Sequence, residues 1–434
     1  MKRVAFHTLG CKVNQYDTQV LVKLFKDKGY EVVDFKEEAD LYIINTCTVT
    51  ATGDSKSRQA IRRTIKNNPK AMVVVTGCYA QTDPEAISSI DGVDLIVGVN
   101  ERAKIVDLVE EKMSQEQTSG LCRVGPMGEL KFEDLQAELS PDRVRTYIKI
   151  QDGCEYFCTY CKVPYARGPM RSRNLDSIIA EARRAVEQGV KEIVLTGIHL
   201  GAYGKEQGGD IALSDVIESL HDLQGLERIR LGSIEPMDIS QELLETMGRL
   251  YKVCRHIHIP LQSGDDMILK RMYRTYTTEE FRTLVNRIKE TLPDCGVTTD
   301  VIVGFPGETE ESFIKTYDFI KDMKFSRLHV FKFSKRSGTP AASFPDQVES
   351  EVKNLRRTEL ISLGQRLSLA FHESLLNKKV DVLIERYRKK RRVAEGLTDT
   401  YVRAYSSGGP DDFGRLVSLY VQRADENGVY GVIS

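Results

Sequence analysis

The residues best suited to chemistry are three cysteines in the middle of the chain. Cys154, Cys158 and Cys161 have the spacing C-x3-C-x2-C and follow an expected strand at 146–151. One short loop can therefore wrap three corners of a 4Fe-4S cluster and leave the fourth iron open. The alternative is a structural zinc site, but such sites usually close with four ligands, and no fourth Cys or His stands nearby in the sequence. We predict a redox cluster with one open coordination position.

The segment from Gly153 to Cys161 resembles the motif of the radical S-adenosylmethionine (SAM) superfamily. The resemblance implies that the open iron chelates the amino and carboxylate groups of SAM and passes an electron to its sulfonium. It also implies a barrel that binds SAM at the carboxyl ends of its strands. The candidate SAM-binding residues are Tyr160, Gly197, Ser233, Glu235 and Gln262. Ordinary packing of Tyr160 and loop capping by the polar residues remain the alternatives.

Three more cysteines each follow an expected strand in the first part of the chain. These are Cys11, Cys47 and Cys78. The carboxyl ends of parallel strands share one edge of a sheet, so these residues are predicted to converge in space. Buried structural thiols are the alternative, because free cysteine is commonly buried. Three cysteines placed in this way favour a shared second cluster, again with an open iron, which here can carry an exogenous sulfur.

The elements that must position these cysteines alternate between strand and helix. In residues 1–117, expected strands at 3–8, 41–45, 72–76 and 94–97 are separated by helical patterns at 20–28 and 55–67, which predicts a doubly wound parallel α/β sheet. Residues 118–142 contain glycines and prolines with little periodicity and are expected to form a linker.

A second alternating segment covers residues 143–377. Its six expected strands lie at 146–151, 192–196, 228–232, 256–260, 297–303 and 327–331, and a helical stretch follows at 345–377. Six βα units predict a partial (β/α)6 barrel rather than a full eight-fold one. Residues 378–434 alternate apolar and polar residues between turn signals, which predicts a small antiparallel β-barrel of the oligonucleotide-binding kind.

Composition and charge narrow the class of protein. The 434 residues include 41% hydrophobic and 29% charged residues, nine cysteines and a formal net charge of −1. The sequence has no apolar run long enough to span a membrane, and the N-terminus does not look like a signal peptide. Nine cysteines are too few for a disulfide scaffold in a chain of this length. We therefore expect a cytoplasmic protein. Basic residues concentrate at 386–392, which is either an RNA-binding stripe or a solvated face.

Together, the three-cysteine N-terminal segment, the SAM motif and the C-terminal β module resemble the radical SAM methylthiotransferase family over essentially the whole chain. The resemblance implies two 4Fe-4S clusters, SAM, an electron donor such as flavodoxin or ferredoxin, and a C-terminal TRAM domain that holds the substrate. Family members insert a methylthio group into a carbon–hydrogen bond of a tRNA adenosine or of a ribosomal-protein aspartate.

Motif details favour one branch of that family. The segment Lys12-Val13-Asn14 and the residues 157–161 look like the bacterial branch that acts on N6-threonylcarbamoyladenosine at tRNA position 37. N6-isopentenyladenosine in tRNA and a ribosomal-protein aspartate are the alternatives, and an iron–sulfur RNA-binding module without turnover is the non-enzyme hypothesis. Three arginines near the SAM motif are expected either to pair with the substrate carboxylate or to bind tRNA phosphates: Arg167, Arg171 and Arg173.

Overall fold

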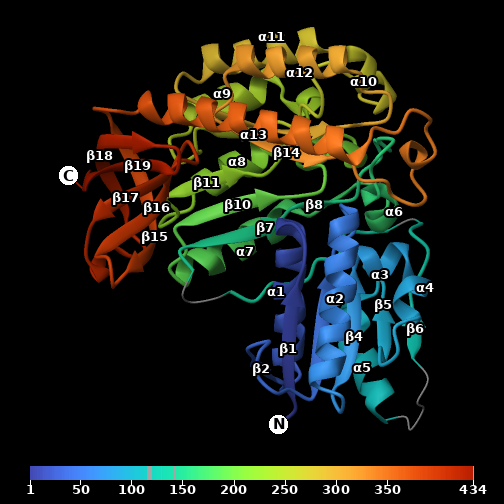
Figure 1. The fold of residues 1–434 in the computed structure, drawn as a ribbon. Coiled ribbons are helices and arrows are strands. Elements are labelled where there is room, and N and C mark those ends of the chain that lie inside the picture. Colours follow the sequence, from blue (N-terminus) through green and yellow to red (C-terminus); the bar gives the residue numbers. More distant parts are fainter. Residues whose placement is uncertain (115–119, 129, 140–142, 434) are drawn as a thin grey trace. The chain divides into compact units, whose positions relative to one another are not determined.

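The computed structural model describes residues 1–114, 120–128, 130–139 and 143–433, which form two compact units (Figure 1). Unit 1 comprises Met1–Leu139, Lys149–Ser177 and Ser334–Ala342, and unit 2 comprises Ser140–Ile148, Ile178–Phe333 and Ser343–Ser434. The predicted end of the first domain at residue 117 and both ends of the predicted linker, 118–119 and 140–142, lie outside the described residues. The predicted domain boundaries therefore stay predictions.

Unit 1 contains a six-stranded, fully parallel sheet of order β2-β1-β3-β4-β5-β6. Its strands are β1 (Arg3–Thr8), β2 (Glu31–Val33), β3 (Leu41–Thr46), β4 (Met72–Gly77), β5 (Leu95–Val97) and β6 (Leu121–Arg123). The four strands expected from the sequence are confirmed to within one residue at each end. The strands β2 and β6 were missed because three residues are too few to show a periodic pattern.

Helices cover both faces of this sheet, as a doubly wound fold requires. They are α1 (Lys12–Asp27), α2 (Ala51–Asn67), α3 (Cys78–Thr82), α4 (Pro84–Ser88) and α5 (Ile105–Ser114). One core places Phe25 of α1 and Val109 of α5 against Val74, and the other places Ile61 of α2 against Val75. The buried strands thus have apolar side chains on both faces, which explains their nearly continuous hydrophobic sequences.

Unit 1 also includes the loop that carries the SAM-motif cysteines. The loop runs between β8 (Gln151–Asp152) and the short helix α6 (Val163–Arg167), and β8 pairs with β9 (Arg171–Ser172) in an antiparallel ribbon. Gly153 has a φ of 79°, and a Cβ there would lie 1.8 Å from the Pro169 carbonyl oxygen, so only glycine fits where the loop leaves the ribbon.

The centre of unit 2 is a partial barrel of six strands. Two parallel three-stranded sheets, β7-β10-β11 and β12-β13-β14, are joined by bridges from Ile229 to Val253 and from Ser233 to His258. The strands are β7 (Arg145–Lys149), β10 (Glu192–Thr196), β11 (Arg228–Leu231), β12 (His256–His258), β13 (Gly296–Val303) and β14 (Arg327–Lys332). These six strands confirm the partial barrel expected from the sequence.

The barrel helices occupy the intervals between the strands. They are α7 (Leu175–Glu187), α8 (Leu213–His221), α9 (Gln241–Arg249), α10 (Asp266–Arg271), α11 (Thr278–Thr291), α12 (Glu310–Met323) and α13 (Ser350–Glu373). Local sequence fixes their starts: Thr277 and Glu280 form a capping box at α11, and the Thr309 hydroxyl accepts a hydrogen bond from the Ser312 N–H at α12.

The C-terminal strands close into a barrel of order β15-β16-β17-β19-β18. They are β15 (Lys379–Arg388), β16 (Val393–Thr398), β17 (Arg403–Ser407), β18 (Leu416–Asp425) and β19 (Gly428–Ile433). This confirms the small β-barrel, with one difference: β17 and β19 pair in parallel. A closed barrel with an odd number of strands cannot alternate direction all the way round, so one parallel pair is unavoidable.

Buried arginines of β11 hold the C-terminal barrel within unit 2. Arg228 donates to the Leu397 carbonyl at 2.9 Å, and Arg230 donates to the carbonyls of Thr398 and Asp399 at 3.0 and 2.9 Å. The carboxylate of Glu192 lies 2.8 Å from Arg230 Nε and balances this buried charge. Throughout the described residues, no helix is both long and apolar enough to cross a membrane.

Candidate iron–sulfur centres

The three N-terminal cysteines lie at the carboxyl ends of adjacent strands. Cys11 follows β1 and occupies the N-cap of α1, Cys47 directly follows β3, and Cys78 begins α3 directly after β4. Because β1, β3 and β4 are neighbours in the sheet, the structure brings the three residues to one edge. In this sheet β2 lies on one side of β1 and β3 lies on the other, so the direction of the strand order reverses at β1. Ligand sites of doubly wound sheets usually lie at such a reversal.

The three cysteines lie close enough for charge on one to affect the pKa of the two buried thiols, Cys47 and Cys78. Burial raises the pKa of Cys47 to about 11, and the neighbouring Cys78 and Cys11 add to that rise. Burial also raises the pKa of Cys78, with Cys11 adding to the effect and Arg167 opposing it. Such thiols ionise when a metal replaces their protons, so this donor set fits an iron–sulfur cluster.

Glycines and one asparagine shape the backbone around this triad. Gly77 has a φ of 95°, and a Cβ there would lie 2.3 Å from Asn45 Oδ1, so the turn before Cys78 requires glycine. The Asn14 side-chain amide donates to the carbonyls of Leu9 and Thr46 at 2.7 and 3.0 Å. Asn14 therefore ties together the turns that carry Cys11 and Cys47.

A buried guanidinium contacts the triad directly. Arg167, at the end of α6, is 0% exposed and donates from Nε to Cys78 Sγ at 3.2 Å. The same side chain donates from its terminal nitrogens to Asn14 Oδ1 at 2.5 Å and to Asp17 Oδ2 at 2.8 Å. A charged donor on a ligand sulfur stabilises the thiolate, so Arg167 belongs to the second layer around this site.

Arg167 is part of a buried ionic cluster in unit 1. The carboxylates of Asp17 and Asp152 lie among the cations of Arg102, Lys149 and Arg167. Burial alone would raise the pKa of both carboxyls, but these cations hold each pKa well below its usual range. The cluster is compensated internally, which is the condition under which buried charges are tolerated.

The expectation that Arg167, Arg171 and Arg173 meet the substrate carboxylate or tRNA phosphates is wrong. All three are buried. Arg171 donates to the carbonyls of Arg167 and Pro169, and Arg173 pairs with Asp134 at 2.8 Å. These guanidiniums are already committed to internal acceptors. The sequence misled because a run of arginines beside a loop looks the same whether it faces solvent or a buried carboxylate.

The SAM-motif cysteines lie in an irregular loop that backbone hydrogen bonds hold in place. The Cys154 N–H donates to the Gly168 carbonyl at 3.0 Å, and the Cys161 N–H donates to the Cys158 carbonyl at 2.9 Å. The Val163 N–H lies 3.4 Å from Cys161 Sγ, the kind of N–H···S contact that supports a ligand sulfur. Cys158 is buried, and Cys154 and Cys161 are half-buried.

The other predicted SAM-binding residues, apart from Tyr160 of the cysteine loop, lie in unit 2. Gly197 follows β10, Ser233 and Glu235 follow β11, and Gln262 lies beyond β12 in a left-handed conformation with φ of 64°. Glu235 forms an ion pair with Arg274, a partner that the sequence did not reveal. Their places at strand ends agree with a barrel ligand site, and their contacts with SAM remain predictions.

One further group in unit 2 is compact enough to hold a single metal ion. His258, Asp300 and His329 come from β12, β13 and β14, and their ligand atoms lie within 4.8 Å of one another. Burial would raise the pKa of Asp300, but hydrogen bonds from both imidazoles hold it well below its usual range. Among the described residues, the sulfur atoms of neither cysteine triad all lie within 4.8 Å of one another. Wider spacing is expected for the ligands of an iron–sulfur cluster, which is larger than one ion.

Comparison with known proteins agrees with this arrangement. The model of the radical SAM superfamily matches residues 148–320, and that of the uncharacterized protein family UPF0004 matches residues 3–98. In solved structures, the fold resembles the radical SAM methyltransferase TsrM from Kitasatospora setae, with a TM-score of 0.61 and 17% identity, covering 79% of this chain and 75% of that one.

Curated relatives match over nearly the full length. The threonylcarbamoyladenosine tRNA methylthiotransferase MtaB of Bacillus subtilis is 46% identical over 429 residues, 98% of this chain and 94% of that protein. The tRNA-2-methylthio-N(6)-dimethylallyladenosine synthase of Acetivibrio thermocellus is 38% identical over 391 residues, 88% of this chain and 81% of that protein. The radical SAM superfamily carries a 4Fe-4S cluster and SAM. This chain is an enzyme that belongs to the radical SAM tRNA methylthiotransferase family.

Proposed function

We propose that the chain converts N6-threonylcarbamoyladenosine at position 37 of tRNA to its 2-methylthio form. The observation that carries the chemistry is the presence of two separate cysteine triads in unit 1, each with three thiols. When bound, two clusters and SAM supply a 5′-deoxyadenosyl radical, a methyl group and the inserted sulfur. Radical chemistry suits the target, because C2 of adenine is unactivated and no acid–base pair would deprotonate it usefully.

The chain's own residues divide this work. Cys154, Cys158 and Cys161 would hold the SAM cluster, while Cys11, Cys47 and Cys78 would hold the cluster that carries sulfur. Arg167 keeps Cys78 Sγ oriented, and Asn14 fixes the two turns beside it. Tyr160, Gly197, Ser233, Glu235 and Gln262 are the proposed SAM contacts. An electron donor such as flavodoxin or ferredoxin and a cytoplasmic location remain predictions.

The C-terminal barrel supports tRNA as the partner. The basic stripe, residues 386–392, covers the end of β15 and the exposed turn that leads to β16, and is called the basic hairpin below. Beside it lies a cavity of about 590 Å³ lined by Arg388, Arg391, Tyr405, Arg423 and Tyr430, among others. Tyr405 and Tyr430 stack with their centroids 4.9 Å apart, and the Arg423 guanidinium lies 3.8 Å from the Tyr430 centroid. Cations beside flat aromatic surfaces are the usual means of binding single-stranded RNA.

The substrate assignment rests on relatedness. The Bacillus relative, named for threonylcarbamoyladenosine, is more similar to this chain than the Acetivibrio relative, named for dimethylallyladenosine. N6-isopentenyladenosine, which is the dimethylallyl substrate, is therefore the second candidate. An aspartate of a ribosomal protein is the third, and the basic hairpin suits RNA better than a protein loop.

The test offers anaerobically reconstituted enzyme three anticodon stem-loops, in which adenosine 37 carries the threonylcarbamoyl group, the isopentenyl group or no substituent. Mass spectrometry of the nucleosides should show methylthiolation of the threonylcarbamoyl RNA and none of a stem-loop with unmodified adenosine. Methylthiolation of only the isopentenyl RNA would promote the second candidate. Turnover of neither RNA, with SAM cleavage intact, would point to the ribosomal protein.

A further inference from the structure

The helix α2 carries a dense set of cations on its exposed side. Its 17 residues include Lys56, Arg58, Arg62, Arg63 and Lys66, against the single acid Asp54. That acid is already paired with Arg336 at 2.7 Å. Lys56, Arg62, Arg63 and Lys66 are exposed, and Lys70 extends the series beyond the end of the helix. The side is therefore strongly positive, although the whole chain has a formal charge of −1.

Several surface cations of unit 1 are paired with acids, but those on the exposed side of α2 are not. Within the described residues, Lys56, Arg62, Arg63, Lys66 and Lys70 form no ion pair. The exposed lysines at the end of α1 do form ion pairs: Lys26 pairs with Glu138 at 2.7 Å, and Lys28 with Asp107 at 3.2 Å. An ordinary solvated helix face mixes both signs, so the uncompensated charge of α2 favours a polyanionic partner.

A groove runs beside this charged face because one helix of the doubly wound pattern is missing. The connection from β2 to β3, residues 34–40, all of which the structure describes, contains no helix. The sheet face over β1 is consequently left open between this connection and α2. The resulting cavity has a volume of about 1530 Å³. It is lined by residues of β1 and α2, of the 34–40 connection and of the loop that follows α2.

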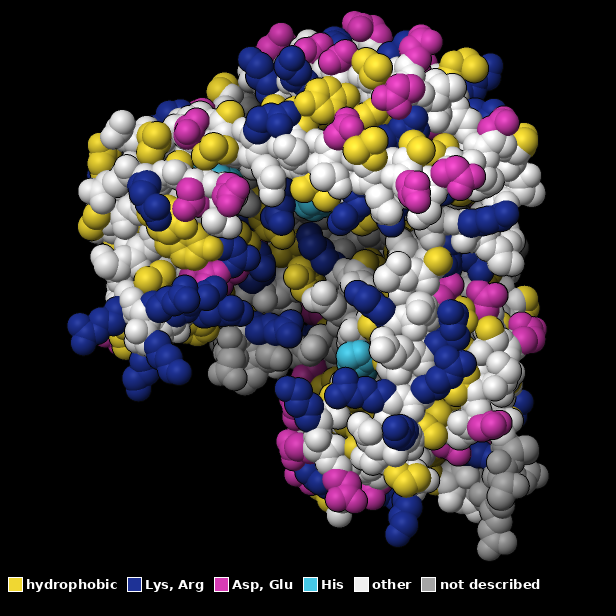
Figure 2. Space-filling model, viewed as in Figure 1, with side chains coloured by type: hydrophobic (Ala, Val, Ile, Leu, Met, Phe, Trp, Pro, Cys, Tyr) yellow, Lys and Arg dark blue, Asp and Glu magenta, His cyan; other side chains and the backbone are white. Residues whose placement is uncertain are grey.

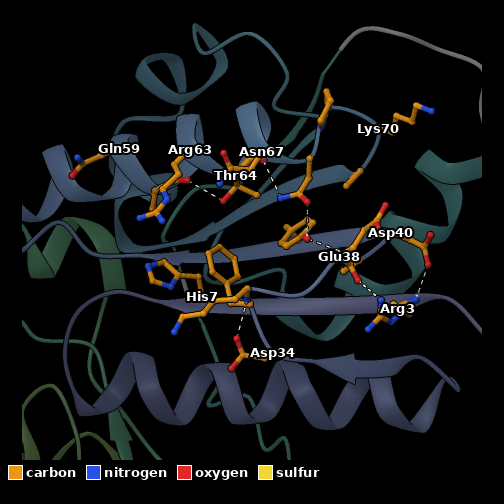
Figure 3. Close-up of a pocket in the computed structure, with 18 of the residues that line it drawn as sticks. Arg3, His7, Asp34, Glu38, Asp40, Gln59, Arg63, Thr64, Asn67 and Lys70 are labelled. Atoms are coloured by element: carbon orange, nitrogen blue, oxygen red, sulfur yellow. Dashed lines mark hydrogen bonds between the residues drawn. The ribbon is translucent and has the colours of Figure 1, made fainter.

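The two ends of the groove differ in charge. At one end the acids of the 34–40 connection lie near Arg3, whose backbone N–H donates to Asp40 at 2.7 Å and whose guanidinium pairs with Glu37 at 2.8 Å. At the other end the Arg63 side chain extends from α2 toward His7 (Figure 3). The His7 ring stacks on Phe35 with centroids 4.6 Å apart. This end therefore offers cations beside a flat aromatic surface.

We propose that the exposed face of α2 and the adjoining end of this groove form a docking surface for the sugar-phosphate backbone of tRNA. Lys/Arg side chains gather over α2 on the face shown in Figure 2. Lys56 and Lys66 are ten residues apart, so the cations extend over about 15 Å of helix and can meet several successive phosphates. This inference rests on the proposed function only in taking tRNA as the partner, and it adds a contact separate from the C-terminal hairpin.

The experiment compares two fourfold variants of the reconstituted full-length enzyme. The test variant carries Lys56→Gln, Arg62→Gln, Arg63→Gln and Lys66→Gln, since glutamine keeps helix propensity while removing charge. The control variant carries Lys23→Gln, Lys26→Gln, Lys28→Gln and Lys104→Gln, four surface cations of the same unit that already pair with acids. Both variants change the net charge by the same amount.

Affinity for unmodified tRNA is measured between 50 and 300 mM salt, with iron content and Tm as checks on folding. The test variant should bind about 10-fold or more weakly at 0.15 M salt, and its log–log salt slope should fall by roughly 0.7–0.9 for each lost phosphate contact, about 3 in all. The control variant should match the wild type.

Equal slopes for the two variants would overturn the inference while leaving tRNA as the substrate. If wild-type enzyme itself failed to bind tRNA, the proposed function would fall, and the inference with it. Backbone contacts carry no sequence information, so the test variant should show the same decrease in salt slope when it binds an unrelated RNA hairpin. Wild-type affinity of the test variant for that hairpin would also contradict the proposal.

Discussion

The Nε–H of Arg167 donates to Sγ of Cys78 at 3.2 Å, and this contact connects the two cysteine triads of unit 1. The helix α6, which ends at Arg167, begins two residues after Cys161, the last cysteine of the SAM motif. The segment that holds one predicted cluster thus also supplies a charged donor to a ligand of the other. Hydrogen bonds to cluster sulfurs are among the main determinants of reduction potential.

Replacing Arg167 should shift the properties of one cluster only. We expect Arg167→Gln to lower the reduction potential of the N-terminal cluster, because the reduced, more negative state loses a cationic donor. The unfolding free energy should also fall, by about 3 kcal/mol or more, because Asp17 and Asp152 lose a buried counter-charge. Redox titration followed by EPR measures the potential, and the SAM cluster provides the internal reference. Equal shifts of both clusters would contradict the assignment, and Arg167→Lys should recover part of the loss.

The SAM-motif cysteines should be separable from the N-terminal ones by iron content. Wild-type enzyme should hold about eight iron per chain after anaerobic reconstitution, from two 4Fe-4S clusters. Replacing Cys154, Cys158 and Cys161 with alanine should leave about four and abolish reductive SAM cleavage. Formation of 5′-deoxyadenosine by this triple variant, measured by chromatography, would refute the site assignment.

The N-terminal triad should give the opposite pattern. Replacing Cys11, Cys47 and Cys78 with alanine should again leave about four iron, yet preserve SAM cleavage, because the radical arises at the other cluster. Sulfur insertion should stop. A useful control is Cys122→Ala, since Cys122 lies on β6, away from the strands that carry the triad. Full methylthiolation by the triple variant would mean that these cysteines are structural.

The basic hairpin of the C-terminal barrel should contribute to RNA affinity. Lys389→Gln, Lys390→Gln, Arg391→Gln and Arg392→Gln together should weaken tRNA binding and flatten its salt dependence. Arg388 is left unchanged because it already pairs with Glu395. The matched control neutralises Lys191, Arg249, Lys315 and Lys378, which are exposed or half-buried and paired with acids in unit 2. If the hairpin variant and the control variant show the same salt slope of tRNA binding, the hairpin is only a solvated surface and does not bind RNA.

Sequence patterns predicted the elements better than the contacts between them. The strand pattern placed Cys11, Cys47 and Cys78 correctly at one edge, because parallel strands order their ends by topology alone. The burial of Arg167 was not predictable, because three of its side-chain acceptors lie far away in sequence: Asp17, for example, is 150 residues distant. The charge of α2 was visible in the sequence but was overlooked beside the denser run at 386–392. The open groove was not visible, because it results from a helix that the fold omits.

The buried charge of Glu192 should make stability depend on pH. Glu192 lies on β10 with no exposed surface, and although burial alone would raise its pKa, Arg230 and Arg228 lower the pKa from 4.5 to about 2. A carboxyl whose pKa is lower in the folded state contributes stability above its unfolded value, and that contribution is lost as pH falls from about 4.5 toward 2. At 1.36 kcal/mol per pKa unit, the contribution at neutral pH is about 3 kcal/mol.

Glu192→Gln should therefore lower Tm at pH 7, and the difference from wild type should shrink as the pH approaches 4 and below. The exposed Glu290→Gln should leave Tm unchanged across this range, and a Tm difference for Glu192→Gln that stays constant with pH would show that its carboxylate charge is not what stabilises the fold.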